Sequence, residues 1–307
     1  MASAKMHDDE VPTDAGLVAR LLAAQFPQWA ELPIAPVPSA GTDNALFRLG
    51  DEMVVRMPRI HWAVGQAEKE QRWLPRLAPH LPLAIPVPLG MGQPGEGYPW
   101  TWSVYAWLDG ENPSSEMADS GQMATDLARF IAALQRIDAA GGPPPGAHNS
   151  WRGVPLAQRD AQTRAAIASL SGDLDTSAAT AVWEAALHAP VWSGPPVWVH
   201  GDLQAGNLLA QAGHLSAVID FGCLGVGDPA CDVMAAWLFL SAENREAFSA
   251  VLKVDDATWV RGRGWALSVG VIALPYYRTS NPILAGIARR AIDEALAGSA
   301  IGGKMGL

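Results

Sequence analysis

Three polar residues in the second half of the chain have the types and the spacing needed to accept a proton and to bind a metal ion. The string HGDLQAGNLL contains Asp202 and Asn207, and the string IDFG contains Asp220. A carboxylate such as Asp202 accepts the proton of an attacking hydroxyl, while the amide oxygen of Asn207 and the carboxylate of Asp220 are oxygen ligands suited to magnesium. This set predicts phosphoryl transfer, with ATP and Mg²⁺ as cofactors.

Short strands and tight loops must position these residues. The run VWV precedes His200 and the run SAVI precedes Asp220, and β-branched and aromatic residues of this kind are typical of strands. The gap AQAGHL between the two strings predicts a turn that folds the second strand back on the first. Aspartate and asparagine are common at turns and helix caps, so the interpretation depends on the whole string and not on one residue.

HGDLQAGNLL, IDFG and GVGDPACDV together resemble the aminoglycoside phosphotransferase family, whose members are relatives of the protein kinases. The kinase pattern of HRD, four residues and Asn, followed by DFG, is met with Gly201 in place of the arginine. The resemblance extends in weaker form over residues 37–297. It implies that Asp202 is the catalytic base, that Asn207 and Asp220 hold magnesium, and that His200 braces the loop.

The segment GDPACD contains Asp228 and Asp232, which resemble buried residues of the family that tie the following helix to the active-site loop. The alternative is that one of them is an N-cap and the other a first-turn acid of that helix. Both interpretations are structural.

The nucleotide-binding segments match the family less regularly. The loop PSAGTDNA resembles the family's phosphate-covering loop, in which backbone amides of Gly41 and Thr42 would bind an anion. The resemblance implies a lysine on the next strand, where this chain has Arg56 in VVRMP. Arginine keeps the positive charge and can bind phosphate through two donors. Its expected partner is a glutamate of QAEKEQRWL, and Glu70 is favoured over Glu68.

The string WSVYAWLDGE resembles the family's hinge between two lobes. The resemblance implies that backbone groups of Ala106 and Leu108 meet the edge of the adenine. Before this point the pattern favours strands, with a helix at 14–29, a hairpin formed by ALFRL and MVVRM, and a helix at 66–77. Beyond it the apolar spacing predicts helices, at 117–137, within 155–190, and at 228–252, 256–277 and 281–297.

This change of pattern predicts an α+β chain with a bilobal, protein-kinase-like fold. We expect a small nucleotide-binding β-sheet lobe over residues 1–105 and a larger, mainly helical lobe over residues 106–307. The second lobe would carry catalysis and acceptor binding. The acceptor pocket is expected to be built by segments 150–192 and 256–297.

Composition narrows the partners. With 21 basic and 31 acidic residues the net charge is −10, which argues against nucleic acid. Ordinary solubility explains this charge by itself, and attraction of a cationic acceptor is the second interpretation. No apolar run is long enough to span a membrane. The polar start of the chain and two isolated cysteines, Cys223 and Cys231, are typical of a reduced cytoplasmic protein.

The predicted reaction is transfer of the γ-phosphoryl group of ATP to a hydroxyl of a small molecule. The resemblance implies an aminoglycoside or a similar antibiotic as acceptor, and hence a role in antibiotic resistance. A macrolide or another small hydroxyl metabolite is the alternative, because a fold does not decide a substrate. A nucleotide-binding pseudokinase is disfavoured because all three catalytic polar residues are present. A metal-dependent hydrolase using His200, Asp202 and Asp220 would need more ligands than cluster here.

Overall fold

The computed structural model describes residues 10–39, 41–114 and 121–297. Within this part the chain forms two compact units. The sheet unit contains the residues up to Asp109 together with Ala217–Gly222, and the helical unit contains Gly110–Ser216 and the residues from Cys223 onward. The segment that carries Asp220 therefore belongs to the sheet unit, although it lies far along the sequence.

A five-stranded antiparallel sheet with the order β1-β2-β3-β5-β4 forms the centre of the sheet unit. Its strands are β1 (Ile34–Pro36), β2 (Asn44–Leu49), β3 (Met53–Pro58), β4 (Pro88–Gly92) and β5 (Trp102–Ala106). The predicted hairpin is β2 and β3, which pair from Asn44 opposite Pro58 to Leu49 opposite Met53. Buried and partly exposed residues alternate along β2, and in β3 from Val54 to Met57, so these two strands share one buried face.

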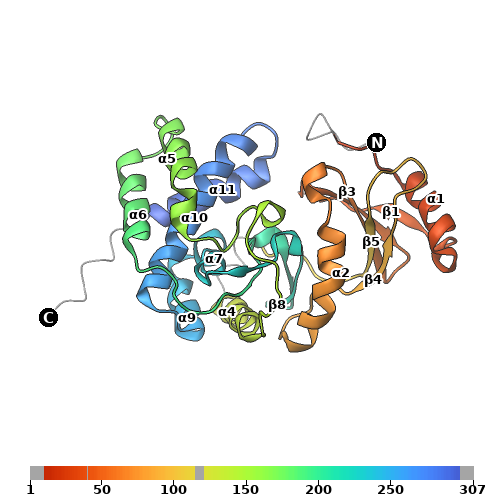
Figure 1. The fold of residues 1–307 in the computed structure, drawn as a ribbon, viewed down its shortest axis with the longest axis horizontal. Coiled ribbons are helices and arrows are strands. Elements are labelled where there is room, and N and C mark those ends of the chain that lie inside the picture. Colours follow the sequence, from red (N-terminus) through yellow and green to blue (C-terminus); the bar gives the residue numbers. More distant parts are fainter. Residues whose placement is uncertain (1–9, 40, 115–120, 298–307) are drawn as a thin grey trace. The chain divides into compact units, whose positions relative to one another are not determined.

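Helices α1 (Ala15–Gln25) and α2 (Gln66–Leu77) lie on opposite sides of this sheet (Figure 1). The apolar face, which includes Val55 and Met57 of β3, packs against α1 in the core of the unit. Arg56 lies between these two residues, so its side chain points to the opposite face, toward α2. The alternation along β3 thus places the charged Arg56 on the side of the sheet where it contacts Glu70 of α2.

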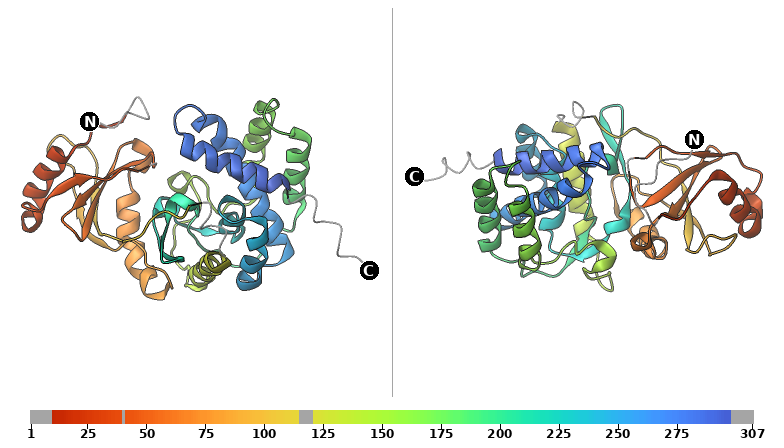
Figure 2. Two further views of the ribbon diagram at one scale, coloured as in Figure 1. Left: turned by 180° about the vertical axis from the view of Figure 1, so that it is seen from behind. Right: turned by 90° about the horizontal axis from the view of Figure 1, so that it is seen from above.

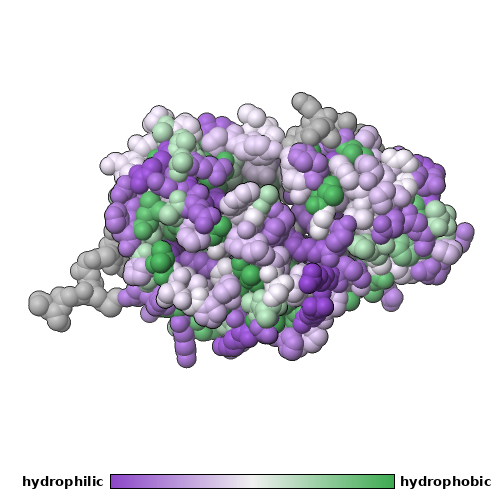
Figure 3. Space-filling view, in the orientation of Figure 1, coloured by the Kyte–Doolittle hydropathy of each residue, from purple (hydrophilic) through white to green (hydrophobic). Residues whose placement is uncertain are grey.

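The helical unit has its longest helix, α10 (Asp256–Tyr277), packed against α6 (Thr176–His188) and α11 (Pro282–Ala297), while α4 (Gly121–Arg136) packs against α9 (Ala242–Leu252). Helix α5 (Asp160–Ser169) lies beside α6, as both views of Figure 2 show. On the face in Figure 3, hydrophobic residues of this unit are scattered among hydrophilic ones. Strands β6 (Val197–Val199) and β9 (Gly225–Gly227) form an antiparallel pair, and β7 (Leu208–Gln211) pairs with β8 (His214–Val218).

The predicted fold class is confirmed, since a strand-rich N-terminal part is followed by a larger helical part. One element is wrong: the single helix expected over 228–252 is three helices, α7 (Ala230–Val233), α8 (Ala235–Leu238) and α9. Its residues up to Leu240 are buried and, apart from Asp228 and Asp232, nearly all apolar. A fully buried segment does not need one continuous amphipathic helix.

Two predicted helices have different ends in the structure. Helix α1 ends at Gln25, short of the expected residue 29, because Pro27 cannot continue the hydrogen-bonding pattern. The start of the helix expected over 117–137 falls partly outside the described residues, and the described helix is α4. None of the helices in the described part is long and apolar enough to cross a membrane.

Candidate functional site

In the helical unit, the loop after β6 brings Asp202 and Asn207 together. The amide nitrogen of Asn207 donates to the backbone oxygen of Asp202 and to its carboxylate Oδ2, both at 2.8 Å. Both amide hydrogens are therefore used, and within the described residues no hydrogen bond reaches the carbonyl oxygen of Asn207. That oxygen is the kind of neutral donor that magnesium accepts. The same contacts hold the carboxylate of Asp202 in one orientation.

Two further side chains hold this loop, and sequence reasoning missed both of them. Gln204 accepts the amide of Gly206 at 2.7 Å. Asn112 donates to three backbone carbonyls of the loop, those of Ala205 at 3.3 Å, Gly206 at 3.0 Å and Leu208 at 2.8 Å. An asparagine in a turn-rich segment is unremarkable in sequence, so nothing distinguished Asn112 before the contact was seen.

Asp232 binds the backbone at the start of the loop. Its two carboxylate oxygens accept the backbone amides of His200 at 2.8 Å and Gly201 at 2.7 Å. The Nδ1 atom of His200 in turn accepts the amide of Asp202 at 3.2 Å. Burial raises the pKa of Asp232 above its ordinary value, and the nearby His200 and the two amides oppose this rise. Asp232 thus links α7 to the loop, as the family resemblance implied.

Gly201 occupies the position where a protein kinase has arginine, and here only glycine fits. Its φ of +83° is rarely adopted by residues with a side chain, and a Cβ atom would lie 2.9 Å from Cβ and Cγ of Arg152. Burial alone would lower the pKa of Arg152. The neighbouring Cys223 and Asp202 raise this pKa by more than burial lowers it, so the net shift is upward. The positive charge near Asp202 therefore comes from another segment of the chain.

Asp228 pairs with an arginine from a distant helix. Its Oδ2 accepts from Nε of Arg261 at 2.8 Å and its Oδ1 accepts from Nη2 of Arg261 at 3.1 Å. Oδ1 also accepts the amide of Ala230 at 2.9 Å, at the start of α7. Asp228 therefore joins the start of α7 to α10, whereas the N-cap of α7 is Pro229 and its first-turn acid is Asp232. The N-cap interpretation is thus wrong for Asp228, and Asp232 is both the first-turn acid and the tie to the loop.

In the sheet unit, Arg56 lies at the centre of a polar cluster. Its Nη1 contacts Oε1 of Glu70 at 2.5 Å, and its Nη2 contacts Oδ1 of Asp220 at 2.7 Å and Oε1 of Gln66 at 3.0 Å. Burial lowers the pKa of Arg56, but the carboxylates of Glu70 and Asp220 raise it well above its ordinary value. The guanidinium is charged at any physiological pH and is held by groups from two segments, α2 and the segment that carries Asp220.

Glu70 has a second partner that the sequence did not suggest. The hydroxyl of Tyr105, on β5, donates to Oε2 of Glu70, so the two oxygens of this buried carboxylate serve different partners. Burial raises the pKa of Tyr105, and the charge of Glu70 adds to the rise, which keeps the phenol neutral. Glu68 instead accepts from Thr101 at 2.8 Å on the exposed side of α2. The structure therefore pairs Arg56 with Glu70.

Asp220 keeps one oxygen available. Its Oδ1 accepts from Arg56 and from the amide of Gly222 at 3.3 Å, whereas no hydrogen bond to Oδ2 occurs among the described residues. The side chain is 44% exposed and the residue has a positive φ of 60°. A partly exposed carboxylate with one free oxygen has the chemistry of a magnesium ligand. The donor set of Asn207 and Asp220 therefore fits the predicted metal, each residue within its own unit.

The two remaining nucleotide-binding predictions, at Gly41 and Thr42 and at Ala106 and Leu108, stay predictions, and the structure shows some of the contacts that these residues make. The amide of Gly41 donates to the hydroxyl of Ser39 at 3.0 Å, and the hydroxyl of Thr42 donates to Asp43 at 2.8 Å. The amide of Ala106 donates to the carbonyl oxygen of Val87 at 3.0 Å. A nucleotide contact through Ala106 would therefore use its carbonyl oxygen, not its amide.

The chain belongs to the phosphotransferase enzyme family, whose model matches residues 34–265. No curated protein matches the chain in sequence. The family membership makes it a phosphotransferase and does not identify its acceptor.

Solved structures share its kinase-like fold at low sequence identity. The GDP complex of aminoglycoside 2'-phosphotransferase-IIIa is 20% identical, with a TM-score of 0.72 over 93% of this chain and 99% of that one. Macrolide 2'-phosphotransferase MphH from Brachybacterium faecium is 22% identical, with a TM-score of 0.61 over 92% and 98%. The streptomycin–ATP complex of APH(2")-IIa is 20% identical, with a TM-score of 0.58 over 85% and 91%.

Proposed function

We propose that this protein transfers the γ-phosphoryl group of ATP to a hydroxyl of a small molecule, with aminoglycosides as the first acceptors to test. The observation that carries the proposal is the contact between Asn207 and Asp202, which holds the carboxylate of Asp202 and leaves the carbonyl oxygen of Asn207 available. A proton acceptor beside a metal ligand is what transfer to a hydroxyl needs. Membership of a phosphotransferase family supports the same reaction.

Within this proposal each residue has one task. Asp202 accepts the proton of the acceptor hydroxyl. Asn207 and Asp220 would hold magnesium, which neutralises charge on the phosphate oxygens during transfer. In residues 1–105, which we propose as the nucleotide-binding lobe, Arg56 held by Glu70 would bind the phosphates, and backbone groups of the loop at 41–42 would cover them.

Residues 106–307 would be the lobe that carries catalysis and acceptor binding. At its start, the carbonyl oxygen of Ala106 and the amide of Leu108 would meet the base of the nucleotide. Protein-kinase-like enzymes read the base through backbone groups of this segment, so the side chains at these positions are free to vary. The choice between ATP and GTP is then a matter of the shape of the pocket, which nucleotide titrations measure directly.

A second candidate acceptor is a macrolide. Macrolide 2'-phosphotransferases are among the solved structures that share the fold, at 20–22% identity. Another small hydroxyl metabolite remains the third possibility, since one fold serves many substrates. Because net charge is −10, a cationic acceptor is favoured by long-range attraction to the protein as a whole.

The test is a screen of phosphoryl transfer across aminoglycosides, macrolides and sugar alcohols, with ATP or GTP and with or without magnesium. We expect one class of acceptor to gain the mass of one phosphoryl group, only when magnesium and nucleotide are both present. Nucleotide binding without transfer to any acceptor would favour a pseudokinase and contradict the proposal. Hydrolysis without any added alcohol would indicate a hydrolase instead.

A further inference from the structure

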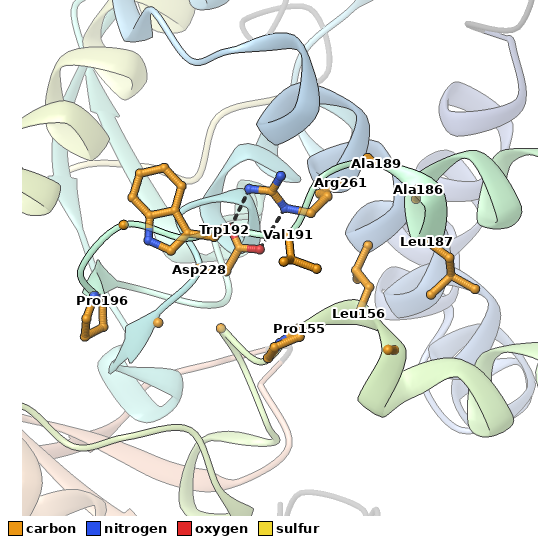
Figure 4. Close-up of a pocket in the computed structure, with 14 residues that line it drawn as sticks. Pro155, Leu156, Ala186, Leu187, Ala189, Val191, Trp192, Pro196, Asp228 and Arg261 are labelled. Carbon is orange, nitrogen blue, oxygen red and sulfur yellow. Dashed lines mark hydrogen bonds and ion pairs between the residues drawn. The ribbon is translucent and has the colours of Figure 1, made fainter.

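A cavity in the helical unit lies outside the groups assigned above to catalysis. Its volume is about 210 Å³, and its walls come from the segments 153–157 and 186–196, from the end of β9, and from α10. Figure 4 shows the residues that surround it. The largest side chains of its apolar wall are Pro155, Leu156, Leu187, Val191, Trp192 and Pro196. Ordinary ligand pockets have roughly 300–1,000 Å³, so this one has room for a ring or an alkyl group rather than for a whole ligand.

The charged groups in the wall neutralise each other. Arg261 and Asp228, joined by dashed lines in Figure 4, form the ion pair described above. The remaining donors of Arg261 reach the carbonyl oxygen of Pro190 at 2.5 Å and the hydroxyl of Thr258 at 3.1 Å. The indole nitrogen of Trp192 donates to the carbonyl oxygen of Pro195 at 2.9 Å. A polycationic ligand would therefore lose its hydration shell in this cavity and find no unpaired carboxylate to replace it. Burying an unpaired charge in this way is unfavourable in free energy.

The apolar wall of the cavity is already formed without a ligand. Gly194 allows the ring of Trp192 to fold over the backbone, since a Cβ atom at this glycine would lie 2.5 Å from the ring. Val191 is 68% exposed, so a large apolar side chain already stands in water at the rim. Covering such groups with an apolar ligand is favourable because it removes apolar surface from water.

The cavity is connected to the catalytic loop through the pair of strands β6 and β9. Val197 lies opposite Gly227 at the end of the pair that adjoins the cavity, and Val199 lies opposite Gly225 at the other end. Asp202 follows β6 at this second end, five residues beyond Val197, so the two places are at most about 17 Å apart at about 3.3 Å per residue. This backbone separation is within the length of one elongated small molecule.

We propose that this cavity holds an uncharged, apolar group of the phosphoryl acceptor, while the hydroxyl of the same molecule lies at Asp202. The inference rests on the proposed phosphotransfer and narrows its acceptor. The acceptor is amphiphilic, with an apolar ring or alkyl group and a hydroxyl within about 17 Å of each other. Among the acceptors named above, this inference favours the macrolide-like class over the aminoglycosides, and the acceptor screen decides between them.

The first test measures binding without any reaction. The uncharged dye N-phenyl-1-naphthylamine, which fluoresces in apolar surroundings, is titrated into the full chain, and we expect saturable binding. Ala189→Phe places a ring into the cavity from its rim, and Val191→Asp places a charge there. Each change should weaken dye binding at least about tenfold.

The matched control is Ala181→Phe, an exposed position of α6 that does not line the cavity, where dye binding should stay within about twofold. Val191 and Ala189 are not core residues, and thermal melting of each variant checks that the fold is kept. Absence of saturable binding to the native chain would overturn the proposal. Equal binding by native chain and both cavity variants would overturn it as well.

The second test separates this inference from the proposed function. With an acceptor that is phosphorylated, the dye should raise the apparent KM for the acceptor and leave the KM for the nucleotide unchanged, and Ala189→Phe should abolish this competition. Inhibition that does not compete with the acceptor would overturn the assignment of the cavity to it. If no acceptor is phosphorylated, the proposed function fails, while the dye titration still decides whether the cavity binds apolar groups.

Discussion

The polar cluster around Arg56 and the loop around Asp202 are built in different ways. In the sheet unit, long charged side chains converge from β3, α2 and the segment that carries Asp220. In the helical unit, short polar side chains hold the backbone of the loop: Asp232 accepts two of its amides, Asn112 donates to three of its carbonyls, and Asn207 contacts Asp202. The first site depends on pairing between charged side chains, and the second depends on hydrogen bonds from side chains to the backbone of one loop.

This difference has energetic consequences. Removing one partner from a buried ion pair leaves a charge without compensation, and the effects of two such removals are not additive. Removing a support of a backbone loop leaves amides without acceptors, and the cost appears in folding stability. The predictions below therefore separate effects on nucleotide binding, expected in the sheet unit, from effects on loop geometry and turnover, expected in the helical unit.

The largest effect is expected for Asp202→Asn. The amide can still be contacted by Asn207 but cannot accept the proton, so turnover should fall by about 10²–10⁴-fold while nucleotide affinity is kept. Steady-state kinetics and calorimetric titration measure the two quantities. The exposed Asp51→Asn is the control and should be silent. Near-normal turnover of the Asp202 variant would place the base elsewhere.

Asp232→Ala should have the next largest effect, on stability. The backbone amides of His200 and Gly201 lose their acceptor in the core, at about 1–3 kcal/mol each. Relief of the buried carboxylate offsets part of this cost, since burial raises the pKa of Asp232. Urea unfolding measures the result, with the exposed Asp256→Ala as control. A change below about 1 kcal/mol would show that the loop does not depend on this support.

Arg56→Ala should raise the nucleotide KM, or lower kcat/KM, by roughly ten- to a hundredfold, as expected for a lost contact of about 1.5–3 kcal/mol. Arg56→Lys should be milder, because one point charge replaces two donors. Glu70→Ala should cause part of the same loss, and the double variant should cost less than the sum of the two.

The control for this cycle is Glu68→Ala, whose carboxylate contacts Thr101 and not Arg56. The effect of Glu68→Ala on the nucleotide KM should add to that of Arg56→Ala. Additive behaviour of Glu70→Ala would mean that the contact seen in the structure does not position Arg56 for the nucleotide. A change in nucleotide kinetics within about twofold for Arg56→Ala would place the phosphate contact elsewhere.

The smallest effect is expected for Tyr105→Phe. It removes the donor to Glu70, which costs about 0.5–1.5 kcal/mol and loosens the carboxylate that holds Arg56. Tyr98→Phe is a matched control, since the hydroxyl of Tyr98 donates to the carbonyl oxygen of Pro58 at 2.8 Å in the same unit. Both variants should lose stability, but only Tyr105→Phe should raise the nucleotide KM. Equal nucleotide KM values for the two would assign Tyr105 a structural role alone.

The sequence by itself predicted the features that depend on neighbours along the chain. The β2–β3 hairpin, helix α2 and the loop with Asp202 and Asn207 are encoded in short strings, because alternation, helical period and turn residues act over a few positions. The order of the two structural classes, strands first and helices later, follows from the same local patterns. Continuous burial hid the breaks between α7, α8 and α9, because periodicity carries no signal where every face is apolar.

Only the tertiary structure decided which distant side chains meet. Tyr105 and Glu70 are 35 residues apart, and Asp228 and Arg261 are 33 apart, and the sequence suggested neither contact. The pair of Arg56 and Glu70, 14 residues apart, was predicted only through the family resemblance. Glu68 and Glu70 have the same chemistry, and the rotation of α2 on the sheet determines that only Glu70 is buried. Pairing at such distances depends on how whole elements pack and on where their loops close, and no local pattern in the chain records that.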